Sequence, residues 1–356
     1  MASNLRVRHN NMYTVLEGRK KMVCVHEKVL FSDEETPQWH REPFIKSGYR
    51  QAYSTFWQCI QSLFYLQNQS FNIWSHLLAT VYFSVRFAVA LNESCAMLDP
   101  LNLPLLSAAI GTITVYSTSA AAHLLNSMSV KAYKTCFFFD YAGISFYSFT
   151  SSQAMFFYTR PVNSNWIIFE SPRLYLSIAS LLSCFSTYTC CKTDARSDKF
   201  SALLRTISFL AAMLNAALPF IAGVTFCSCH ATEPCLALAG CNSLSLNYYA
   251  YHVICLIFGG LIYSSRIPER FFPGAFDYIG NSHHFLHILA SLGTDFALRM
   301  IEMNMKQAKN KEILAIAMVD VSFCNTLGLS ILLLLANAGI VVWFARAPGG
   351  HTSAKN

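Results

Sequence analysis

The sequence has little charge. Only 13% of its 356 residues are Asp, Glu, Lys or Arg, whereas soluble domains carry about 25% of these residues. A chain with so few charged side chains cannot coat a water-facing surface, which excludes a soluble domain. Its hydrophobic content of 54% excludes a disordered chain as well. The composition therefore indicates a membrane protein, and its 28 Phe and 17 Tyr residues suit lipid-facing and interfacial surface.

A second absence concerns the N-terminal region. The first 50 residues lack an apolar run of the kind that a cleavable signal peptide requires, so we expect the first membrane span to act as its own insertion signal. No segment resembles a nucleic-acid-binding module. The net charge is +7, and the N-terminal tail contains the cations Arg6, Arg8, Arg19, Lys20 and Lys21. We expect this tail to be attracted to anionic lipids of the bilayer and not to nucleic acid.

Eight stretches are apolar enough to span a bilayer, for which about 20 residues are needed. They cover residues 73–91, 103–125, 135–158, 174–191, 203–226, 248–265, 283–303 and 322–345. The sequence therefore predicts an all-α fold, a polytopic membrane bundle.

The placement of Lys and Arg predicts the orientation of this bundle. With the N-terminus in the cytosol, 19 of these residues fall in cytosolic segments and six in outside segments. Positive charge is enriched on the cytosolic side of membrane proteins, so we expect a cytosolic N-terminus and, with eight spans, a cytosolic C-terminus. The remaining cation, Arg86, lies within the first span, where we expect it to snorkel to the interface or to contact a lipid headgroup.

Several cysteines gather in the outside segments. Cys227, Cys229, Cys235 and Cys241 lie between the fifth and sixth spans, and Cys95 lies in the first outside loop. In an oxidising compartment they can form one or two disulfides. Free thiols are an equally open alternative, and the pairing cannot be read from the sequence.

Ionisable residues inside the spans are costly, which makes each of them a candidate for function. His123 lies near the end of the second span, Asp140 near the start of the third, and His283, His284 and His287 at the start of the seventh. Under the orientation above, all of them lie at one depth, in the cytosolic leaflet. We expect a polar site at that depth.

The spacing of the histidines points to a metal ion. His283 and His287 are four residues apart, so on a helix both imidazoles project from one face and can bind one ion. Adding His123 gives three nitrogen ligands, the number typical of a zinc site that keeps its fourth position for water. Ser119 precedes His123 by one helical turn, and Asp140 can hold a ligand imidazole or accept the proton of a zinc-bound water. Zinc is thus the predicted cofactor.

The simpler alternative is a set of hydrogen-bonded interior histidines without a metal. His284 and His287 can also pair at i, i+3, but His284 points about 100° away from His283, and we interpret it as a packing residue. His76 in the first span and His252 in the sixth lack partners at the right depth or spacing. We interpret both as structural.

Several strings in the sequence resemble the progestin and adipoQ receptor family. They cover about residues 40–300, in order and at family-like spacing, and are Phe44–Arg50 (FIKSGYR), Asn72–Leu77 (NIWSHL), Ser119–His123 (SAAAH), Phe139–Gly143 (FDYAG) and Ile267–Gly280 (IPERFFPGAFDYIG) running into Ser282–His287 (SHHFLH). The Pro-Glu-Arg-x-x-Pro-Gly segment and the extra C-terminal span are similar to the membrane progestin receptor branch, more than to the adiponectin receptor branch.

The resemblance implies a seven-helix core with a cytosolic N-terminus and a zinc site near the cytosolic face. The family's three zinc-binding histidines fall on His123, His283 and His287, and its Ser and Asp near the zinc fall on Ser119 and Asp140.

The same resemblance divides the chain into three parts. They are a cytosolic N-terminal segment (1–72), a seven-transmembrane core with the zinc site (73–303), and a C-terminal part (304–356) with an outside loop, the eighth transmembrane helix at about 322–345 and a short cytosolic tail. The sequence departs from its relatives at His284, where they commonly have Gln, and at Asn281, where they often have His.

For function, the resemblance implies a plasma-membrane receptor for a steroid of the progestin type or another lipid, with G proteins as a candidate partner in the cytosol. The related adiponectin receptors imply an alternative, a zinc-dependent hydrolase of a lipid amide such as ceramide. In that enzyme Asp140 is the general base, and Ser119 orients the nucleophile or stabilises the oxyanion. A third hypothesis gives zinc only a structural role in a scaffold. The sequence leaves the three open.

Overall fold

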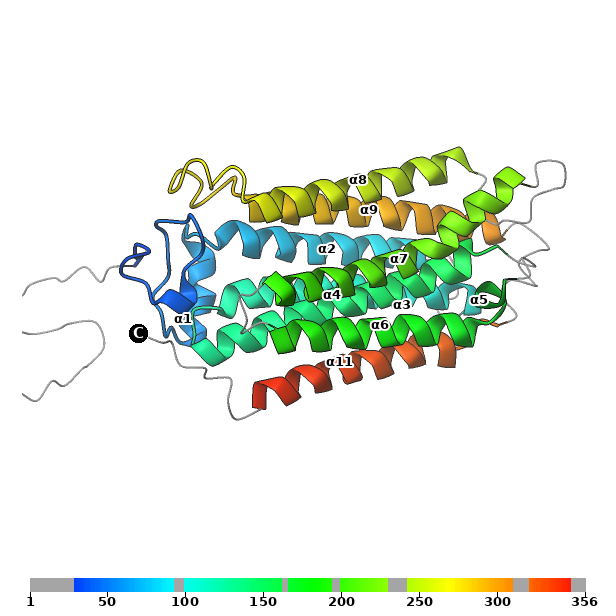
Figure 1. Ribbon diagram of the computed structural model, residues 1–356, viewed down its shortest axis with the longest axis horizontal. Helices are drawn as coiled ribbons and strands as arrows, with labels where there is room; N and C mark the ends of the chain where they lie inside the picture. The colour runs from blue at the N-terminus through cyan, green and yellow to red at the C-terminus, as the bar shows by residue number, and fades with distance from the viewer. Residues whose placement is uncertain are drawn as a thin grey trace, which may run out of the picture.

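The computed structural model describes residues 29–92, 99–161, 166–193, 199–229, 242–309 and 320–346. Within these ranges, eight long helices run side by side along the length of the molecule (Figure 1). They are α2 (Ser70–Asn92), α3 (Leu103–Leu125), α4 (Val130–Thr159), α6 (Pro172–Thr193), α7 (Lys199–Cys229), α8 (Ser243–Ser265), α9 (Ser282–Lys309) and α11 (Leu329–Arg346), the last of which continues from a π-helical turn over Cys324–Gly328. Two short helices, α1 (Phe56–Gln61) and α5 (Ile167–Glu170), lie at opposite ends of the bundle (Figure 1).

Each predicted span falls on one of the long helices, so the prediction of an all-α, polytopic bundle is confirmed. Six helices are long and apolar enough to cross a membrane by length and composition, namely α2, α3, α6, α7, α8 and α11. The other two, α4 and α9, carry more polar side chains. Because α4 contacts α3, α6, α7, α9 and α11, it is enclosed by protein, and polar side chains on it cost less than they would facing lipid.

Helices α3 and α4 approach each other closely at two glycines. A Cβ atom at Gly143 would overlap the side chain of Thr118, and a Cβ atom at Gly111 would overlap the side chain of Thr150. Only glycine leaves room for the facing helix at such positions. The contact at Gly143 involves Thr118, the neighbour of Ser119, so it fixes the middle of α4 against the part of α3 that carries the predicted site.

The structure corrects the interpretation of Arg86. Its guanidinium is paired within the protein and not with a lipid headgroup. Nη2 donates to both carboxylate oxygens of Glu302, at 3.0 and 2.9 Å. Asp295 adds a second carboxylate at 3.7 Å. A charge within a span is far less costly when it is paired, and this pairing joins α2 to α9 through residues that are more than 200 positions apart.

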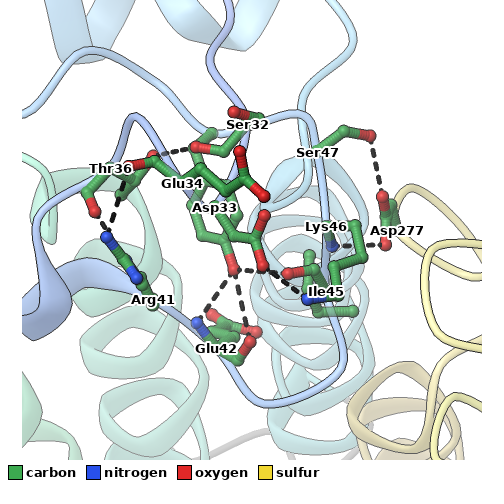
Figure 2. Close-up of polar contacts among 11 residues, drawn as sticks. Ser32, Asp33, Glu34, Thr36, Arg41, Glu42, Ile45, Lys46, Ser47 and Asp277 are labelled. Atoms are coloured by element: carbon green, nitrogen blue, oxygen red, sulfur yellow. Dashed lines mark hydrogen bonds and ion pairs between the residues drawn. The ribbon is translucent and has the colours of Figure 1, made fainter.

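The N-terminal segment, residues 29–69, covers one end of the bundle beside the connection between α8 and α9 (Figure 1). Figure 2 shows how Asp277 of that connection holds it: the Lys46 backbone N–H donates to Oδ1 at 3.0 Å, and the Ser47 hydroxyl donates to Oδ2 at 2.7 Å. The Lys46 ammonium in turn contacts Asp33 at 2.7 Å. The segment is therefore part of the folded structure and is tied to the start of α9.

His40 makes the docking of this segment sensitive to pH. It is 4% exposed, and burial, together with the charge of Arg50, lowers its pKa from 6.5 to about 4. A released segment takes up a proton near pH 6.5, whereas the docked one does so only near pH 4. The docked state is therefore fully stable above pH 6.5. As the pH falls from 6.5 to 4 and below, the free energy that favours docking decreases by as much as about 3 kcal/mol.

This expectation can be followed through Trp39, whose ring centroid lies 5.2 Å from that of His40. Trp fluorescence should report release of the segment in the wild type between pH 6.5 and 4. A His40→Gln variant, which does not titrate there, should show a flatter profile. Identical profiles for the two proteins would contradict the role of His40.

The predicted disulfides lie outside what the structure describes. Cys95, Cys235 and Cys241 fall in segments between the described ranges, and the side chains of Cys227 and Cys229 are not among those described. The pairing of these cysteines stays a prediction.

Candidate metal centre

Three histidines from two helices converge at the end of the bundle that the N-terminal segment covers. His123 lies in the last turn of α3, and His283 and His287 lie in the first turns of α9. The Nε2 atom of His283 lies 3.1 Å from Nε2 of His123 and 3.2 Å from Nε2 of His287. One ligand atom from each ring lies within 4.8 Å of the other two. The structure thus confirms that these residues meet, and the three together can hold a metal ion.

The outer nitrogens of two rings are held by hydrogen bonds that define their protonation. His123 Nδ1 lies 2.7 Å from Oε1 of Gln69, and the orientation of that amide is set because its Nε2 donates to Glu42. His287 Nδ1 lies 2.9 Å from the hydroxyl of Ser75, which donates its own proton to a backbone carbonyl. Gln69 Oε1 can accept from His123 Nδ1, and the Ser75 hydroxyl can accept from His287 Nδ1. In the tautomers with protons on Nδ1, the lone pairs of both Nε2 atoms face the centre of the triad.

Without a cation, this arrangement leaves an Nε2 lone pair unsatisfied. If His283 carries its proton on Nε2, it can donate to one neighbouring lone pair but not to both. Its own Nδ1 is buried and has no hydrogen-bond partner among the described residues, with or without an ion on Nε2. Buried polar groups are rarely left unpaired, and a divalent ion accepts all three Nε2 lone pairs at once. The residues present therefore fit a metal ion.

Arg50 holds the helix end that carries His123. The sequence alone placed Arg50 in the string FIKSGYR and gave it no role at the site. Its guanidinium is 2% exposed. Nη2 donates to the carbonyl of His123 at 2.7 Å and to Oδ1 of Asn126 at 2.6 Å, and Nη1 donates to the carbonyl of Leu124 at 2.6 Å. The last carbonyls of a helix have no partner within the helix, so Arg50 caps α3 and fixes the backbone of a candidate ligand.

The start of α9 is capped in the same manner. Glu269, which is 2% exposed, accepts hydrogen bonds from the backbone N–H of Ser282, at 2.8 Å, and from its hydroxyl. A carboxylate at a helix N-terminus satisfies free N–H groups and complements the helix dipole. The turn that carries His283 is therefore fixed by a residue outside the helix.

Ser119 and Asp140 lie next to this centre. The Ser119 hydroxyl lies close enough to the Asp140 carboxylate to interact with it, so α4 meets the turn of α3 directly before His123. Asp140 is not among the residues whose ligand atoms converge in the triad. Its predicted catalytic role, and that of Ser119, stay predictions.

The remaining intramembrane histidines have different surroundings. His284 accepts a hydrogen bond from the backbone N–H of Gly280 at 2.9 Å and packs against Phe71, in agreement with its interpretation as a packing residue. His252 bonds the carbonyl of Gly293 at 2.8 Å. His76 lies at the site after all, because its ring stacks on that of His287 with 3.6 Å between centroids. Its distance along the chain from the other histidines concealed this contact.

Gln69 offers a test of the outer hydrogen bonds. Replacing it by Leu removes the acceptor that holds His123 in the metal-binding tautomer, and loss of such a partner typically costs 10–100-fold in metal affinity. We expect zinc affinity, measured by competition with a chromophoric chelator, to fall within this range. The control is Gln61→Leu on the exposed side of α1, which should bind zinc as the wild type does. Equal affinity of all three proteins would show that Gln69 does not position His123.

Comparison with known proteins agrees with this architecture. The family described as haemolysin-III related (HlyIII) matches residues 64–298. Membrane progestin receptor delta of Mus musculus is 33% identical over 287 residues, which cover 79% of this chain and 80% of that protein. Membrane progestin receptor gamma-A of Danio rerio is 30% identical over 346 residues, or 92% of this chain and 96% of that protein. Membrane progestin receptor beta of Homo sapiens is 30% identical over 282 residues, or 78% and 75% of the two chains. This chain therefore belongs to the haemolysin-III-related progestin and adipoQ receptor family, in its membrane progestin receptor branch.

Proposed function

We propose that this chain is a multi-pass receptor of the plasma membrane that binds a progestin-type steroid and carries a zinc ion on His123, His283 and His287. The observation that carries the proposal is the similarity, over more than three quarters of the chain, to membrane progestin receptors of the delta, gamma and beta kinds. A steroid is apolar enough to enter a helical bundle from the bilayer.

The proposed orientation puts the N-terminal segment and the histidine triad at the cytosolic face. The excess of Lys and Arg in the segments at that face supports it. A signal can then pass from the bundle to the cytosol through the N-terminal segment, which contacts α3 through Arg50 and the α8–α9 connection through Lys46. G proteins are the proposed partners at this surface.

Zinc is the metal that suits the donor set, since three neutral imidazoles are a common ligand group for this ion. Bound there, zinc would supply a Lewis acid. The chain's own residues position the three imidazoles. Gln69 and Ser75 hold two imidazoles in the tautomer that presents Nε2, and Arg50 fixes the backbone of His123.

Saturable binding of labelled progesterone to membranes that express the chain tests the proposal. We expect competition by unlabelled progestin, and loss of both zinc and binding in a His123→Ala variant. No saturable binding to the wild type would reject the steroid proposal. Loss of zinc with intact binding would show that the metal is structural.

A second candidate function rests on the proximity of Ser119 to Asp140. In a zinc-dependent lipid amide hydrolase, Asp140 would take a proton from the attacking water, and Ser119 would orient that carboxylate. Removal of a general base typically costs 10²–10⁴-fold in rate. Purified protein should then release fatty acid from ceramide, and Asp140→Asn should slow the release by that factor. Release no faster than from His123→Ala would reject the enzyme.

A further inference from the structure

His76 is a buried imidazole without a polar partner. The residue is 8% exposed, and neither Nδ1 nor Nε2 forms a hydrogen bond within the part of the chain that the structure describes. An imidazole in either neutral tautomer has one donor and one acceptor to satisfy. Burying the two ring nitrogens without partners costs free energy, because each nitrogen loses its hydrogen bond to water. A bound group from outside the described residues can supply the missing hydrogen bonds.

The ring of His76 is held in one orientation. It stacks on His287, with centroids 3.6 Å apart and planes inclined by 9°, and it meets the ring of Tyr116 at 88° with centroids 5.0 Å apart. The ring therefore has little freedom to turn toward another partner. Its nitrogens are positioned in advance for whatever they bind.

The nearest polar side chains are already engaged. Ser75 donates to the carbonyl of Asn72 and contacts His287. The Tyr116 hydroxyl lies 3.2 Å from the carbonyl of Ala290 and 2.9 Å from Oγ1 of Thr294. Within the described residues, neither side chain is free to serve His76, so a bound molecule can take that place.

The depth of His76 indicates which molecules can reach it. Its neighbour Tyr116 precedes His123 by seven residues on α3, which places Tyr116 about 10 Å further from the end that the N-terminal segment covers. His76 thus lies on the side of the triad that faces the middle of the bundle. A ligand that enters from the bilayer meets this face, whereas the N-terminal segment covers the opposite side.

We propose that His76 binds the carbonyl oxygen of the apolar ligand by donating a hydrogen bond from its ring. This inference rests on the proposed function, which supplies a ligand of lipid character. Steroid ketones and lipid amides share the required chemistry, a neutral carbonyl oxygen on an apolar skeleton. A neutral imidazole suits such an oxygen, and the stacked ring places it beside the candidate metal ligand His287.

The test uses His76→Phe in full-length protein, because Phe keeps a ring that can stack on His287 but lacks both nitrogens. We expect normal zinc content and a roughly tenfold weaker affinity for progesterone, the size of effect typical for one hydrogen bond. A progestin in which both ketones are reduced to methylene groups should bind the wild type more weakly, and His76→Phe should cost no further affinity with it. Competition by ceramide distinguishes an amide ligand from a steroid. The matched control is His252→Phe, which should leave affinity for progesterone unchanged.

Thermal stability of the unliganded proteins decides the proposal without any ligand. Because the nitrogens of His76 have no partner among the residues that the structure describes, the unliganded His76→Phe variant should melt no lower than the wild type. A melting temperature several degrees lower would show that His76 has a structural partner and would overturn the proposal. Progesterone affinity equal to that of the wild type would overturn it too. If the wild type binds neither progesterone nor ceramide, the proposed function fails, and the melting temperatures still decide the role of His76.

Discussion

Replacing His287 by Ala should lower zinc affinity by more than the 100-fold or so that loss of an outer hydrogen-bond partner costs. The substitution removes one of only three converging nitrogens, and two imidazoles hold zinc far less well than three. It also removes the ring on which His76 stacks. Competition between the purified protein and a chromophoric chelator measures the change.

His284→Ala is the matched control for this experiment. His284 lies on the same turn of α9 and is buried, but its hydrogen bond goes to the backbone of Gly280. We expect His284→Ala to keep its zinc. If both variants lost zinc equally, the loss would reflect damage to the helix, and if His287→Ala kept wild-type affinity, His287 would not be a ligand.

The second large effect is expected at Arg50. In Arg50→Met, an apolar side chain takes the place of the guanidinium, and the carbonyls of His123 and Leu124 and the amide oxygen of Asn126 lose their donors. A buried acceptor left unpaired costs about 1–3 kcal/mol, so we expect a loss of at least about 3 kcal/mol in stability. Zinc affinity should fall as well, because the backbone of His123 is released.

Arg50→Lys should recover little of this loss, since a single ammonium cannot reproduce the planar set of donors of a guanidinium. The control is Arg41→Met in the same segment, because Arg41 is exposed and, among the described residues, donates to the carbonyls of Thr36 and Glu34 in its own loop. Melting temperatures and chelator competition measure both effects. Unchanged values for Arg50→Met would contradict the capping role.

The helices were predictable because a long apolar segment in a bilayer must satisfy its backbone hydrogen bonds internally, and a helix does so within one segment. Polar α9 was recognised in spite of Asp295, Arg299 and Glu302, which lie on it. What the sequence did not reveal was the partner of Arg86. Glu302 lies 216 residues away, and only the packing of α2 on α9 brings the two charges together.

The histidine triad was predictable for a different reason. Counting spans and charges placed the end of α3 and the start of α9 at one depth. The i, i+4 spacing then placed His283 and His287 on one face of α9. Arg50 and Gln69 were missed because each lies before the first span and acts on a helix end through tertiary contacts. No local periodicity marks such residues.

The structure gives a physical meaning to the strings that carried the resemblance. In the first, Arg50 caps α3, and in the second, Ser75 and His76 contact His287. In the last, Glu269 caps α9 and Asp277 holds the N-terminal segment. Segments far apart in the chain therefore share one task, which is to hold three imidazoles in place.

The central claim is that these imidazoles bind zinc, and X-ray absorption at the zinc edge of the purified wild-type protein tests it most directly. We predict one zinc ion per chain, bound by three imidazole nitrogens at about 2.0–2.1 Å and by one oxygen in the fourth position. Protein without stoichiometric zinc, or zinc bound through sulfur, would contradict the assignment of His123, His283 and His287 as its ligands.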